Sequence, residues 1–364
     1  MNYLAYFILF FALLQFVVAT VNLIFLQRYP KNEHPFSGLV SVLIPARNEE
    51  KNIGVLLQEL SNQEYVNIEI LVYNDQSQDR TVEIVEEFSK TDKRIKIING
   101  KELPKGWLGK NNACHQLAKN ATGEYFLFLD ADVRVRTPII QNTTKLAEKH
   151  NLGLLSIFPM QKMESVGEQL TVPNMNYILL TLLPLILVRI TGYPSLAAAN
   201  GQFMLFNARI YKQLFPHQKM KTSKVEDIEI ARFYKNNNIN VACLVGNPSI
   251  TCRMYTGFKQ AVYGFSKNAI QFFGGSFILA ILFWLITTFG FIVILLQFPA
   301  GLFAAYLVLQ LLTRGFVSAA SRQSIWRNLL MAIPQQIIIG LFIFQALVNV
   351  FKKQYTWKDR KIQS

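Results

Sequence analysis

Four apolar stretches near the two ends of the chain constrain its fold more than any other feature. A helix that crosses a bilayer needs about 20 consecutive, mostly apolar residues. Residues 3–26, 276–298, 301–320 and 329–351 each reach roughly that length. The sequence therefore predicts a membrane-bound chain whose middle part, which is more polar, folds in water.

The first apolar stretch is predicted to be an anchor. Its only polar residues are Gln15, Thr20 and Asn22. A secretory signal peptide would have a basic start, a shorter apolar core and a cleavage site of small residues. No Lys or Arg precedes residue 3, so we expect an uncleaved transmembrane anchor over residues 1–27. Arg28 and Lys31 follow it and are expected on the cytoplasmic side, where basic residues concentrate.

The C-terminal part is predicted to hold transmembrane helices over residues 276–351 and a basic tail over residues 352–364. Four complete spans would place this tail outside the cell, against the usual excess of positive charge in the cytoplasm. The number of spans and the side of the C-terminus therefore stay open. Residues 257–275 carry apolar side chains at helical spacing and are predicted to form an amphipathic interfacial helix. We expect a multi-pass protein of the cell membrane with its more polar middle part on the cytoplasmic side.

One further apolar stretch, residues 176–190, is too short to span a bilayer and contains Pro184 and Arg189. A span there would place two candidate site residues, Asp130 and Asp227, on opposite sides of the membrane. We therefore interpret this stretch as an interfacial or acceptor-binding helix.

The balance of charge is basic, with 37 Lys and Arg against 23 Asp and Glu, which gives +14 at pH 7. Nucleic acids, anionic lipids and phosphorylated small molecules all attract basic proteins. Many of these cations flank the apolar stretches, where membrane topology and lipid headgroups account for them, so we expect no nucleic-acid partner. The three cysteines, Cys114, Cys243 and Cys252, lack metal-ligand spacing and are too few for a disulfide framework, which favours a reducing compartment.

The middle of the chain, residues 38–256, alternates short apolar strands with polar helices. Strands are predicted at residues 40–45, 68–73, 94–98, 125–129, 154–158, 202–206 and 241–245, and helices at 49–62, 79–89, 111–119 and 226–235. This alternation predicts an α/β domain with a mainly parallel sheet. Ligands of such sheets bind beyond the carboxyl ends of the strands, which points to residues 46–50, 74–79 and 130–132.

Acidic residues follow three of these predicted strands. Asp130 and Asp132 come directly after an apolar strand, and side chains two residues apart on a strand point the same way. Such a pair can hold a divalent cation that bridges a diphosphate, although a solvated turn also fits the pattern. Asp75 can bind a nucleobase or ribose, or it can be an ordinary turn residue. Asp79, which follows it, is predicted to be the N-cap of the next helix. Glu49 fits a ligand site or the first turn of a helix equally well.

The remaining candidates lie beside predicted helices. Lys110 follows two glycines at a helix start and can meet phosphate oxygens, although the spacing is not that of a Walker loop. The first strand also lacks G-x-G-x-x-G, which counts against a dinucleotide-binding oxidoreductase. Asp227, with Glu226 before it, fits either a general base or an acidic pair that stabilises a helix start. Asn200, Gly201 and Gln202 fit a polar pocket wall or an ordinary strand entry.

Taken together, these residues resemble glycosyltransferase family 2 of the GT-A type. The matching pieces are Pro45-Ala46-Arg47-Asn48-Glu49, the turn at Asp75, Asp130-Ala131-Asp132 and Glu226-Asp227, in the family's order. Residues 106–110 and 199–203 are similar to a membrane-bound subgroup that includes the glycosyltransferases of carotenoid and hopanoid pathways and, more distantly, ceramide glucosyltransferase. The resemblance covers roughly residues 40–273.

The resemblance implies an inverting transfer from a nucleotide-sugar, with UDP as the favoured nucleotide, to the hydroxyl or carboxyl of a lipid-like acceptor. It assigns Pro45, Ala46, Glu49 and Asp75 to the nucleotide, Asp130 and Asp132 to the ribose and to Mn²⁺ or Mg²⁺, and Asn200, Gly201 and Gln202 to the acceptor. Asp227 is then the catalytic base, with Glu226 beside it, and Lys110 contacts the donor phosphates.

One departure from the family pattern concerns processive members, which carry Q-x-x-R-W after the base. Residues 255–263 of this chain lack that motif, which favours transfer of a single sugar. Arg253 or Lys267 is a candidate for the missing arginine's phosphate contact. Two alternatives stay open: a polyprenyl-phosphate sugar transferase of the same fold, and a non-enzymatic membrane scaffold with a degenerate nucleotide-sugar domain. The oligomeric state also stays open.

Overall fold

The computed structural model describes residues 2–26, 36–65, 67–352, 356–357 and 360–361. It divides into two compact units. The sheet unit comprises residues 27–160 and 185–252, and the helical unit comprises residues 1–26, 161–184 and 253–364. Arg28 and Lys31 beside the predicted anchor, and Lys353 and Lys358 in the predicted basic tail, lie outside the described residues.

A seven-stranded sheet forms the centre of the sheet unit, in the order β3-β2-β1-β4-β8-β6-β9. Its strands are β1 (Val40–Ala46), β2 (Ile68–Asn74), β3 (Ile95–Asn99), β4 (Tyr125–Leu129), β6 (Leu152–Phe158), β8 (Phe203–Asn207) and β9 (Asn240–Val245). Most are nearly continuous runs of apolar residues, as expected for strands covered on both faces. Six of them run in one direction, whereas β8 runs antiparallel to its neighbours β4 and β6.

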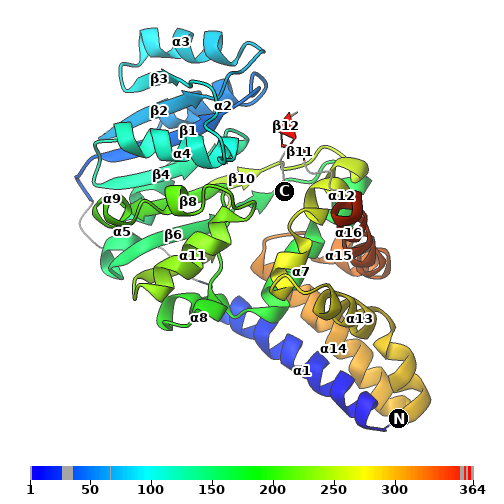
Figure 1. Ribbon diagram of the computed structural model, residues 1–364. Helices are drawn as coiled ribbons and strands as arrows, with labels where there is room; N and C mark the ends of the chain where they lie inside the picture. The colour runs from blue at the N-terminus through cyan, green and yellow to red at the C-terminus, as the bar shows by residue number, and fades with distance from the viewer. Residues whose placement is uncertain (1, 27–35, 66, 353–355, 358–359, 362–364) are drawn as a thin grey trace. The chain divides into compact units, whose positions relative to one another are not determined.

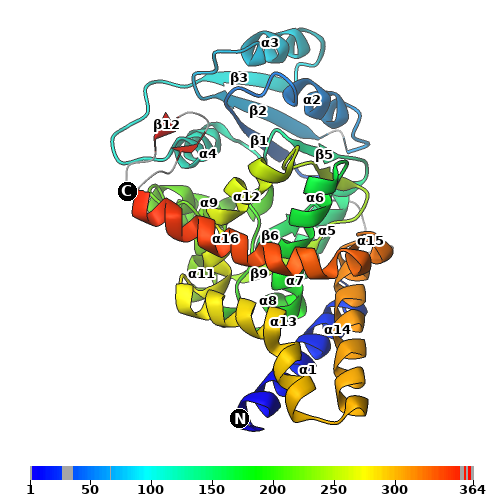
Figure 2. The same cartoon turned by 90° about the vertical axis from the view of Figure 1, so that its right-hand side faces the viewer.

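Helices cover both faces of this sheet (Figure 1). One face carries α2 (Ile53–Ser61), α3 (Thr81–Thr91) and α5 (Ile139–Lys149), and the other carries α4 (Gly109–Asn120) and α11 (Glu226–Asn236), as the two perpendicular views agree (Figure 2). The alternation of side chains along β4 explains both layers. Leu127 and Leu129 belong to the core beneath α2 and α5, whereas Phe126 and Phe128 pack against the ring of Tyr211 on the other face.

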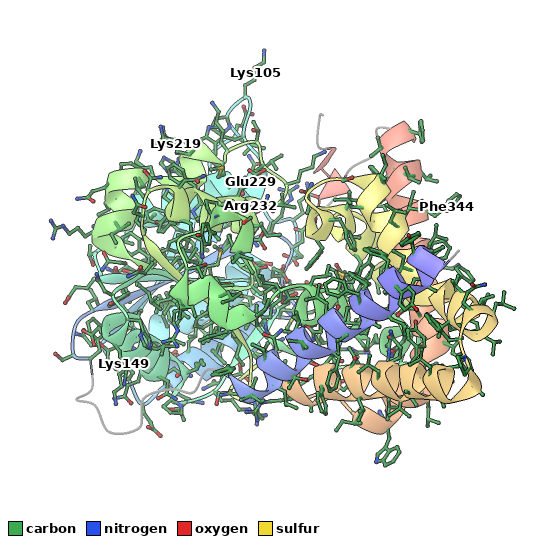
Figure 3. The ribbon with its side chains drawn as sticks, turned by 90° about the horizontal axis from the view of Figure 1, so that it is seen from below. Lys105, Lys149, Lys219, Glu229, Arg232 and Phe344 are labelled. Carbon is green, nitrogen blue, oxygen red and sulfur yellow. The ribbon has the colours of Figure 1, made fainter. Side chains whose placement is uncertain are left out.

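Shorter elements complete the sheet unit. They are β5 (Val133–Val135), α8 (Leu185–Ile190), the 3₁₀ helix η1 (Pro194–Leu196), α9 (Ala208–Leu214), α10 (Pro216–Lys219) and β10 (Ile250–Cys252). β10 pairs antiparallel with β5. The chain leaves this unit through β7 (Met160–Gln161). Exposed lysines such as Lys105, Lys149 and Lys219 project from its surface (Figure 3).

The direction of β8 has a consequence for ligand binding. Because the other strands end at one edge of the sheet, an antiparallel β8 must begin at that same edge. The segment before β8, residues 200–202, therefore joins the loops that follow β1, β2 and β4 at the carboxyl edge. Polar residues far apart in the sequence meet there.

The helical unit contains the apolar stretches. Its helices are α1 (Asn2–Ile24), α6 (Val166–Thr171), α7 (Pro173–Leu182), α12 (Phe258–Ser266), the 3₁₀ helix η2 (Ala269–Phe273), α13 (Phe277–Gln297), α14 (Ala300–Ala320), α15 (Ile325–Leu330) and α16 (Ala332–Lys352). Four of the described helices, α1, α13, α14 and α16, are long and apolar enough to cross a membrane. α1 lies alongside α14, and apolar side chains such as Phe344 of α16 stay exposed (Figures 1 and 3). Two short strands, β11 (Thr356–Trp357) and β12 (Arg360–Lys361), pair near the C-terminus.

Two predicted helices are interrupted in the structure. The stretch 176–190 divides into α7 and α8 around Leu183 and Pro184, because proline has no backbone N–H to continue a helix. The stretch 257–275 divides into α12 and η2, which Gly274 ends in a left-handed conformation. The structure also groups residues 161–184, inside the predicted domain 38–256, with the helical unit.

Candidate active site

Asp130 and Asp132 follow β4 at the carboxyl edge of the sheet, where the sequence places them. The backbone N–H of Asp130 donates to the carbonyl of Gln202, at 3.3 Å, which ties the end of β4 to the entry of β8. The Asp130 side chain is 28% exposed, so its carboxylate remains accessible to a ligand. Burial raises the pKa of the Cys252 thiol, and the nearby carboxylate of Asp132 raises it further.

Lys110 connects this carboxylate to the start of α11. Its Nζ contacts both oxygens of Asp130, at 2.8 Å and 3.0 Å, and lies 3.6 Å from Oε1 of Glu226. It also donates to the carbonyl of Gly201 at 3.4 Å. Burial alone would lower the pKa of Lys110, but the carboxylates of Asp130 and Glu226 outweigh it and raise that pKa above its ordinary value.

Asp227 is oriented by two backbone donors. The N–H of Gly201 donates to Oδ2 at 2.9 Å, and the N–H of Ile228 donates to Oδ1 at 2.8 Å. Burial raises the pKa of Asp227, while these donors and Lys110 oppose the rise. Burial also raises the pKa of Glu226 to about 7, with Lys110 lowering it and Asp227 adding to the rise. Both adjacent carboxyl groups thus have a raised pKa, which makes each a better proton acceptor than a carboxylate in water.

Gly201 stands at the centre of this cluster. A Cβ added to it would lie 3.0 Å from Nζ of Lys110, 3.5 Å from Oε1 of Glu226 and 3.7 Å from Oδ2 of Asp227. The absence of a side chain therefore leaves a small space that these polar groups face. The structure brings together Lys110, Asp130, Gly201, Glu226 and Asp227, all of which the sequence singled out.

Asn111 and Ser156 position this cluster, and the sequence motifs identified neither of them. The amide of Asn111, beside Lys110 on α4, donates to the carbonyls of Met220 (2.7 Å) and Ser223 (3.0 Å), just before α11 begins. The hydroxyl of Ser156 exchanges two hydrogen bonds with the backbone of Asn200 (2.7 Å and 3.1 Å). Ser156 is the only polar side chain of β6, and that isolation is the signal that could have identified it.

Gln202 is almost fully buried beside the cluster. Its amide Nε2 donates to Sγ of Cys252 at 2.9 Å, and its backbone N–H donates to Oδ1 of Asn200 at 2.9 Å. Its Oε1 is buried without a hydrogen-bond partner among the described residues. Behind Lys110, buried His217 bonds the Tyr211 hydroxyl through Nδ1 at 2.7 Å, and burial lowers the pKa of His217 to about 3. His217 therefore stays neutral and structural.

Glu49 and Asp75 form a second group at the ends of β1 and β2. The register pairs Pro45 with Tyr73 and Ala46 with Asn74, so the two loops leave the sheet side by side. The N–H of Asp75 donates to the carbonyl of Ala46 at 2.8 Å, and Arg47 donates to the carbonyl of Asp75 at 2.6 Å. Glu49 accepts a hydrogen bond from Asn52 at 3.0 Å. In the order β2-β1-β4, this group lies next to Asp130 at the same edge.

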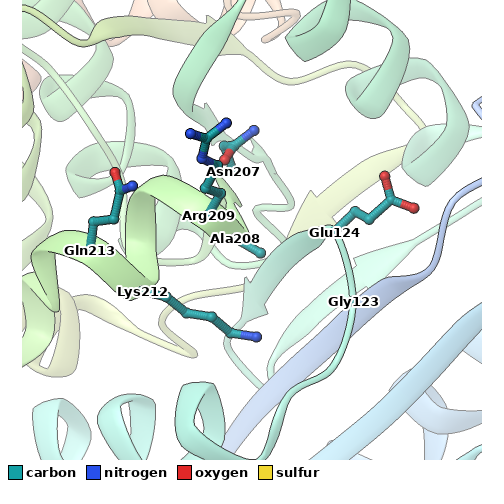
Figure 4. Close-up of a pocket in the computed structure, with 7 residues that line it drawn as sticks. All are labelled: Gly123, Glu124, Asn207, Ala208, Arg209, Lys212 and Gln213. Atoms are coloured by element: carbon teal, nitrogen blue, oxygen red, sulfur yellow. The ribbon is translucent and has the colours of Figure 1, made fainter.

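A pocket of about 420 Å³ opens in these loops and is lined by Asn48, Glu49, Glu50, Lys51, Asn52, Gln78 and Asp79. A larger pocket, about 580 Å³, is lined by Gly123, Glu124, Asn207, Ala208, Arg209, Lys212 and Gln213 (Figure 4). Glu124 precedes β4 and Asn207 ends β8, so the larger pocket lies at the opposite edge of the sheet from Asp130. Its position separates it from the acidic cluster.

The two candidates for a further phosphate contact lie in the helical unit and have other contacts. Arg253 donates to Glu168 at 2.9 Å and pairs with Glu164 at 2.5 Å. Nζ of Lys267 lies 4.4 Å from the ring centre of Tyr263. Their proposed role in phosphate binding stays a prediction.

No group of three or more His, Cys, Asp or Glu side chains is arranged to hold a metal ion by itself in the described part of the chain. The carboxylates of Asp130 and Asp132 are nevertheless the hard oxygen ligands that Mn²⁺ and Mg²⁺ prefer. The ammonium group of Lys110 already stands against both oxygens of Asp130, which shows that this position accepts a cation. The residues therefore fit a divalent cation that takes its other ligands from a bound diphosphate.

Comparisons with known proteins bear on the family and the fold of the chain. Residues 41–215 match the model of glycosyl transferase family 2. The chain is 28% identical over 250 residues to a 4,4'-diaponeurosporenoate glycosyltransferase of Staphylococcus haemolyticus, covering 65% of this chain and 63% of that protein. It is 26% identical over 262 residues to the protein of the same name in Staphylococcus aureus, covering 68% and 65%. The matches thus span a little under two thirds of the length of these relatives.

A solved structure resembles nearly the whole chain. It is the mannosyltransferase PcManGT from Pyrobaculum calidifontis in complex with GDP-Man and Mn²⁺, with a TM-score of 0.58 and 16% identity over 97% of this chain and 98% of that one. At this identity the likeness concerns the fold. It confirms the predicted α/β fold class with added apolar helices, and together with the family match it confirms the resemblance inferred from the sequence. Residues 41–215 therefore resemble a glycosyl transferase family 2 domain, and the chain has the GT-A fold.

Proposed function

We propose that this protein is an inverting glycosyltransferase. It moves a single sugar from a nucleotide-sugar to the hydroxyl or carboxyl of a lipid-like acceptor at the cytoplasmic face of the membrane. One observation carries the proposal: Lys110 links Asp130 at the end of β4 to the Glu226–Asp227 pair of α11, at the carboxyl edge of a family 2 sheet. A donor-binding carboxylate and a candidate base are thereby held in one cluster.

The donor is assigned to the edge formed by β2, β1 and β4. Pro45, Ala46, Glu49 and Asp75 surround the two loops in which the nucleotide would lie. Asp130 and Asp132 follow on the next strand and would hold the ribose and a Mn²⁺ or Mg²⁺ ion. When bound, that ion would offset the charge that develops on the leaving diphosphate. UDP stays the preferred nucleotide on the family resemblance alone.

The transfer step follows from the position of Asp227. An acceptor oxygen attacks the anomeric carbon while the bond from that carbon to the diphosphate oxygen breaks, and the configuration inverts. Asp227 takes the proton of a hydroxyl acceptor in this step. The N–H groups of Gly201 and Ile228 keep its carboxylate oriented, and Asn200 and Gln202 border the acceptor side.

The lipid-like acceptor is supported by two independent observations. Four of the described helices are long and apolar enough to cross a membrane. Two relatives carry the name of a transferase acting on diaponeurosporenoate. An apolar acceptor of that kind resides in the bilayer, so an enzyme that uses it must work at the membrane surface.

Lipid mass spectrometry tests the proposed activity in cells. Lipids are extracted from the native host, from a strain without the gene, and from that strain complemented with wild type, Asp227→Asn or Asp130→Ala. We expect a glycolipid that disappears on deletion and returns with wild type but not with Asp130→Ala. Unchanged lipid profiles in all strains would reject the proposed activity and favour the scaffold alternative.

Asp227→Asn then separates classes of acceptor. With a hydroxyl acceptor, loss of the base should reduce turnover by about 10²-fold or more. An acceptor that is already ionised, such as a carboxylate or a polyprenyl phosphate, needs no base and should lose little turnover. Purified wild type and variant are compared with the acceptor found by mass spectrometry, and equal rates on a hydroxyl acceptor would reject Asp227 as the base.

A further inference from the structure

We propose that Lys110 and a divalent cation compete for Asp130, so that Lys110 must leave this carboxylate before the metal binds. The inference rests on the proposed use of a metal at Asp130 and goes beyond it, because it assigns to Lys110 an exchange between two positions. Because Lys110 moves towards Glu226 when the metal and donor bind, it links their binding to the Glu226–Asp227 pair, which includes the candidate base.

The contacts of Lys110 show that it occupies the oxygens a metal ion would need. Its Nζ lies 2.8 Å from Oδ1 and 3.0 Å from Oδ2 of Asp130, so it occupies both oxygens of the carboxylate. A divalent cation binds carboxylate oxygens at roughly 2.0–2.6 Å. An ion at that distance would stand against the ammonium group, and two like charges so close repel strongly. Metal and lysine therefore exclude each other at Asp130.

The second step concerns where the ammonium group goes. Oε1 of Glu226 lies 3.6 Å from Nζ, and the carbonyl of Gly201 lies 3.4 Å away. Glu226 begins α11 and Gly201 lies in the segment before β8, so neither acceptor belongs to the metal pair. The Lys110 side chain is 24% exposed, and Gly201 contributes no side chain to block its path. A short movement brings Lys110 away from Asp130 and towards Glu226.

The exchange has a consequence for the order of binding. Without a donor, the ion must replace a well-placed ammonium group and gains only the two aspartates as protein ligands. With a donor present, the diphosphate supplies further oxygens to the ion and an anionic partner to the displaced lysine. Mn²⁺ should therefore bind weakly to the protein alone, and removal of the lysine charge should strengthen it.

Mn²⁺ titrations of the metal-free, full-length protein in detergent micelles test this, with calorimetry as the readout and no donor present. Lys110→Met should bind Mn²⁺ at least about tenfold more tightly than wild type, since a nearby like charge is removed. Lys110→Arg keeps the charge and should behave as wild type. Lys119→Met, an exposed lysine of the same helix, is the matched control and should also behave as wild type. Asp130→Asn should abolish the gain.

A measurement on the wild type guards against misfolding of the variant. Lys110 is acetylated with an amine-reactive reagent, with and without Mn²⁺, and quantified by mass spectrometry against Lys119. Mn²⁺ should increase the labelling of Lys110, because a lysine released from the Asp130 carboxylate loses part of its protection, and should leave Lys119 unchanged. No change at Lys110 at saturating Mn²⁺ would overturn the proposal.

Failure of this inference can be distinguished from failure of the proposed function. If Lys110→Met binds Mn²⁺ no more tightly than wild type while wild type still produces the glycolipid, the exchange is rejected and the transferase stands. If wild type neither binds Mn²⁺ nor produces a glycolipid, both are rejected.

Discussion

Gly201 illustrates how one residue limits the chemistry of this site. Its N–H orients Asp227, its carbonyl accepts from Lys110, and its missing side chain leaves the space between them. A methyl group there would meet the flexible end of Lys110 at 3.0 Å, which can move aside at little cost to the fold. The same methyl group would fill the space that the reacting groups need.

We therefore expect Gly201→Ala to separate activity from stability. Turnover should fall at least about tenfold, because small displacements in an active site carry large kinetic costs. The free energy of unfolding should change by less than about 1 kcal/mol. Gly192→Ala is the matched control, since nothing lies within 4 Å of a Cβ added there. Transfer assays and thermal melts are compared, and normal activity in Gly201→Ala would contradict the crowded geometry.

The end of α7 shows how one element depends on another in the helical unit. Pro184 has no N–H to donate to the carbonyl of Leu180, four residues earlier. The amide of Asn22 on α1 takes that place, donating to Leu180 at 3.0 Å and to the carbonyl of Leu183 at 2.9 Å. The N-terminal helix therefore caps a helix that lies far away in the sequence.

Asn22→Leu should destabilise the protein by about 1–3 kcal/mol, because it leaves two carbonyls without this donor in an apolar environment. Thermal unfolding in detergent measures the loss. Thr20→Val on the same helix should change the stability by less than about 0.5 kcal/mol, since the Thr20 hydroxyl only bonds a carbonyl of its own helix. Equal melting temperatures for wild type and Asn22→Leu would contradict the capping role.

At the scale of the whole molecule, the apolar helices predict a membrane location. Four described helices are long and apolar enough to span, and many of their large side chains are exposed in the protein alone. Exposed apolar surface of this extent is stable only in contact with lipid or another protein.

The full-length protein should therefore remain in the membrane fraction after high-salt and alkaline carbonate washes. High salt screens electrostatic attraction and releases proteins that are held to the membrane only by charge. A protein attached only through its net charge of +14 would therefore be released by the wash. Detergent should be needed for extraction. Release by salt would show that the basic surface, rather than the helices, attaches the protein to the membrane.

The sequence alone determined the local and periodic features of this protein. Apolar runs predicted the helices of the helical unit, and alternation of strands and helices predicted the sheet, because both depend on near neighbours in the chain. The positions of the predicted strand ends were enough to select Glu49, Asp75 and Asp130 as edge residues. The division of 176–190 into α7 and α8 at Pro184 was not predicted, although a proline is a local signal for such a break.

The tertiary structure decided which of these residues meet. The antiparallel direction of β8 brings Gly201 to the edge where β4 ends, and no periodicity in the sequence reports the direction of a strand. The distances from Lys110 to Asp130 and Glu226, and the support from Asn111 and Ser156, follow from packing between segments that lie far apart in the chain. Burial, which raises the pKa of Asp227, is likewise a property of the packed molecule, because it depends on everything that surrounds the carboxyl group.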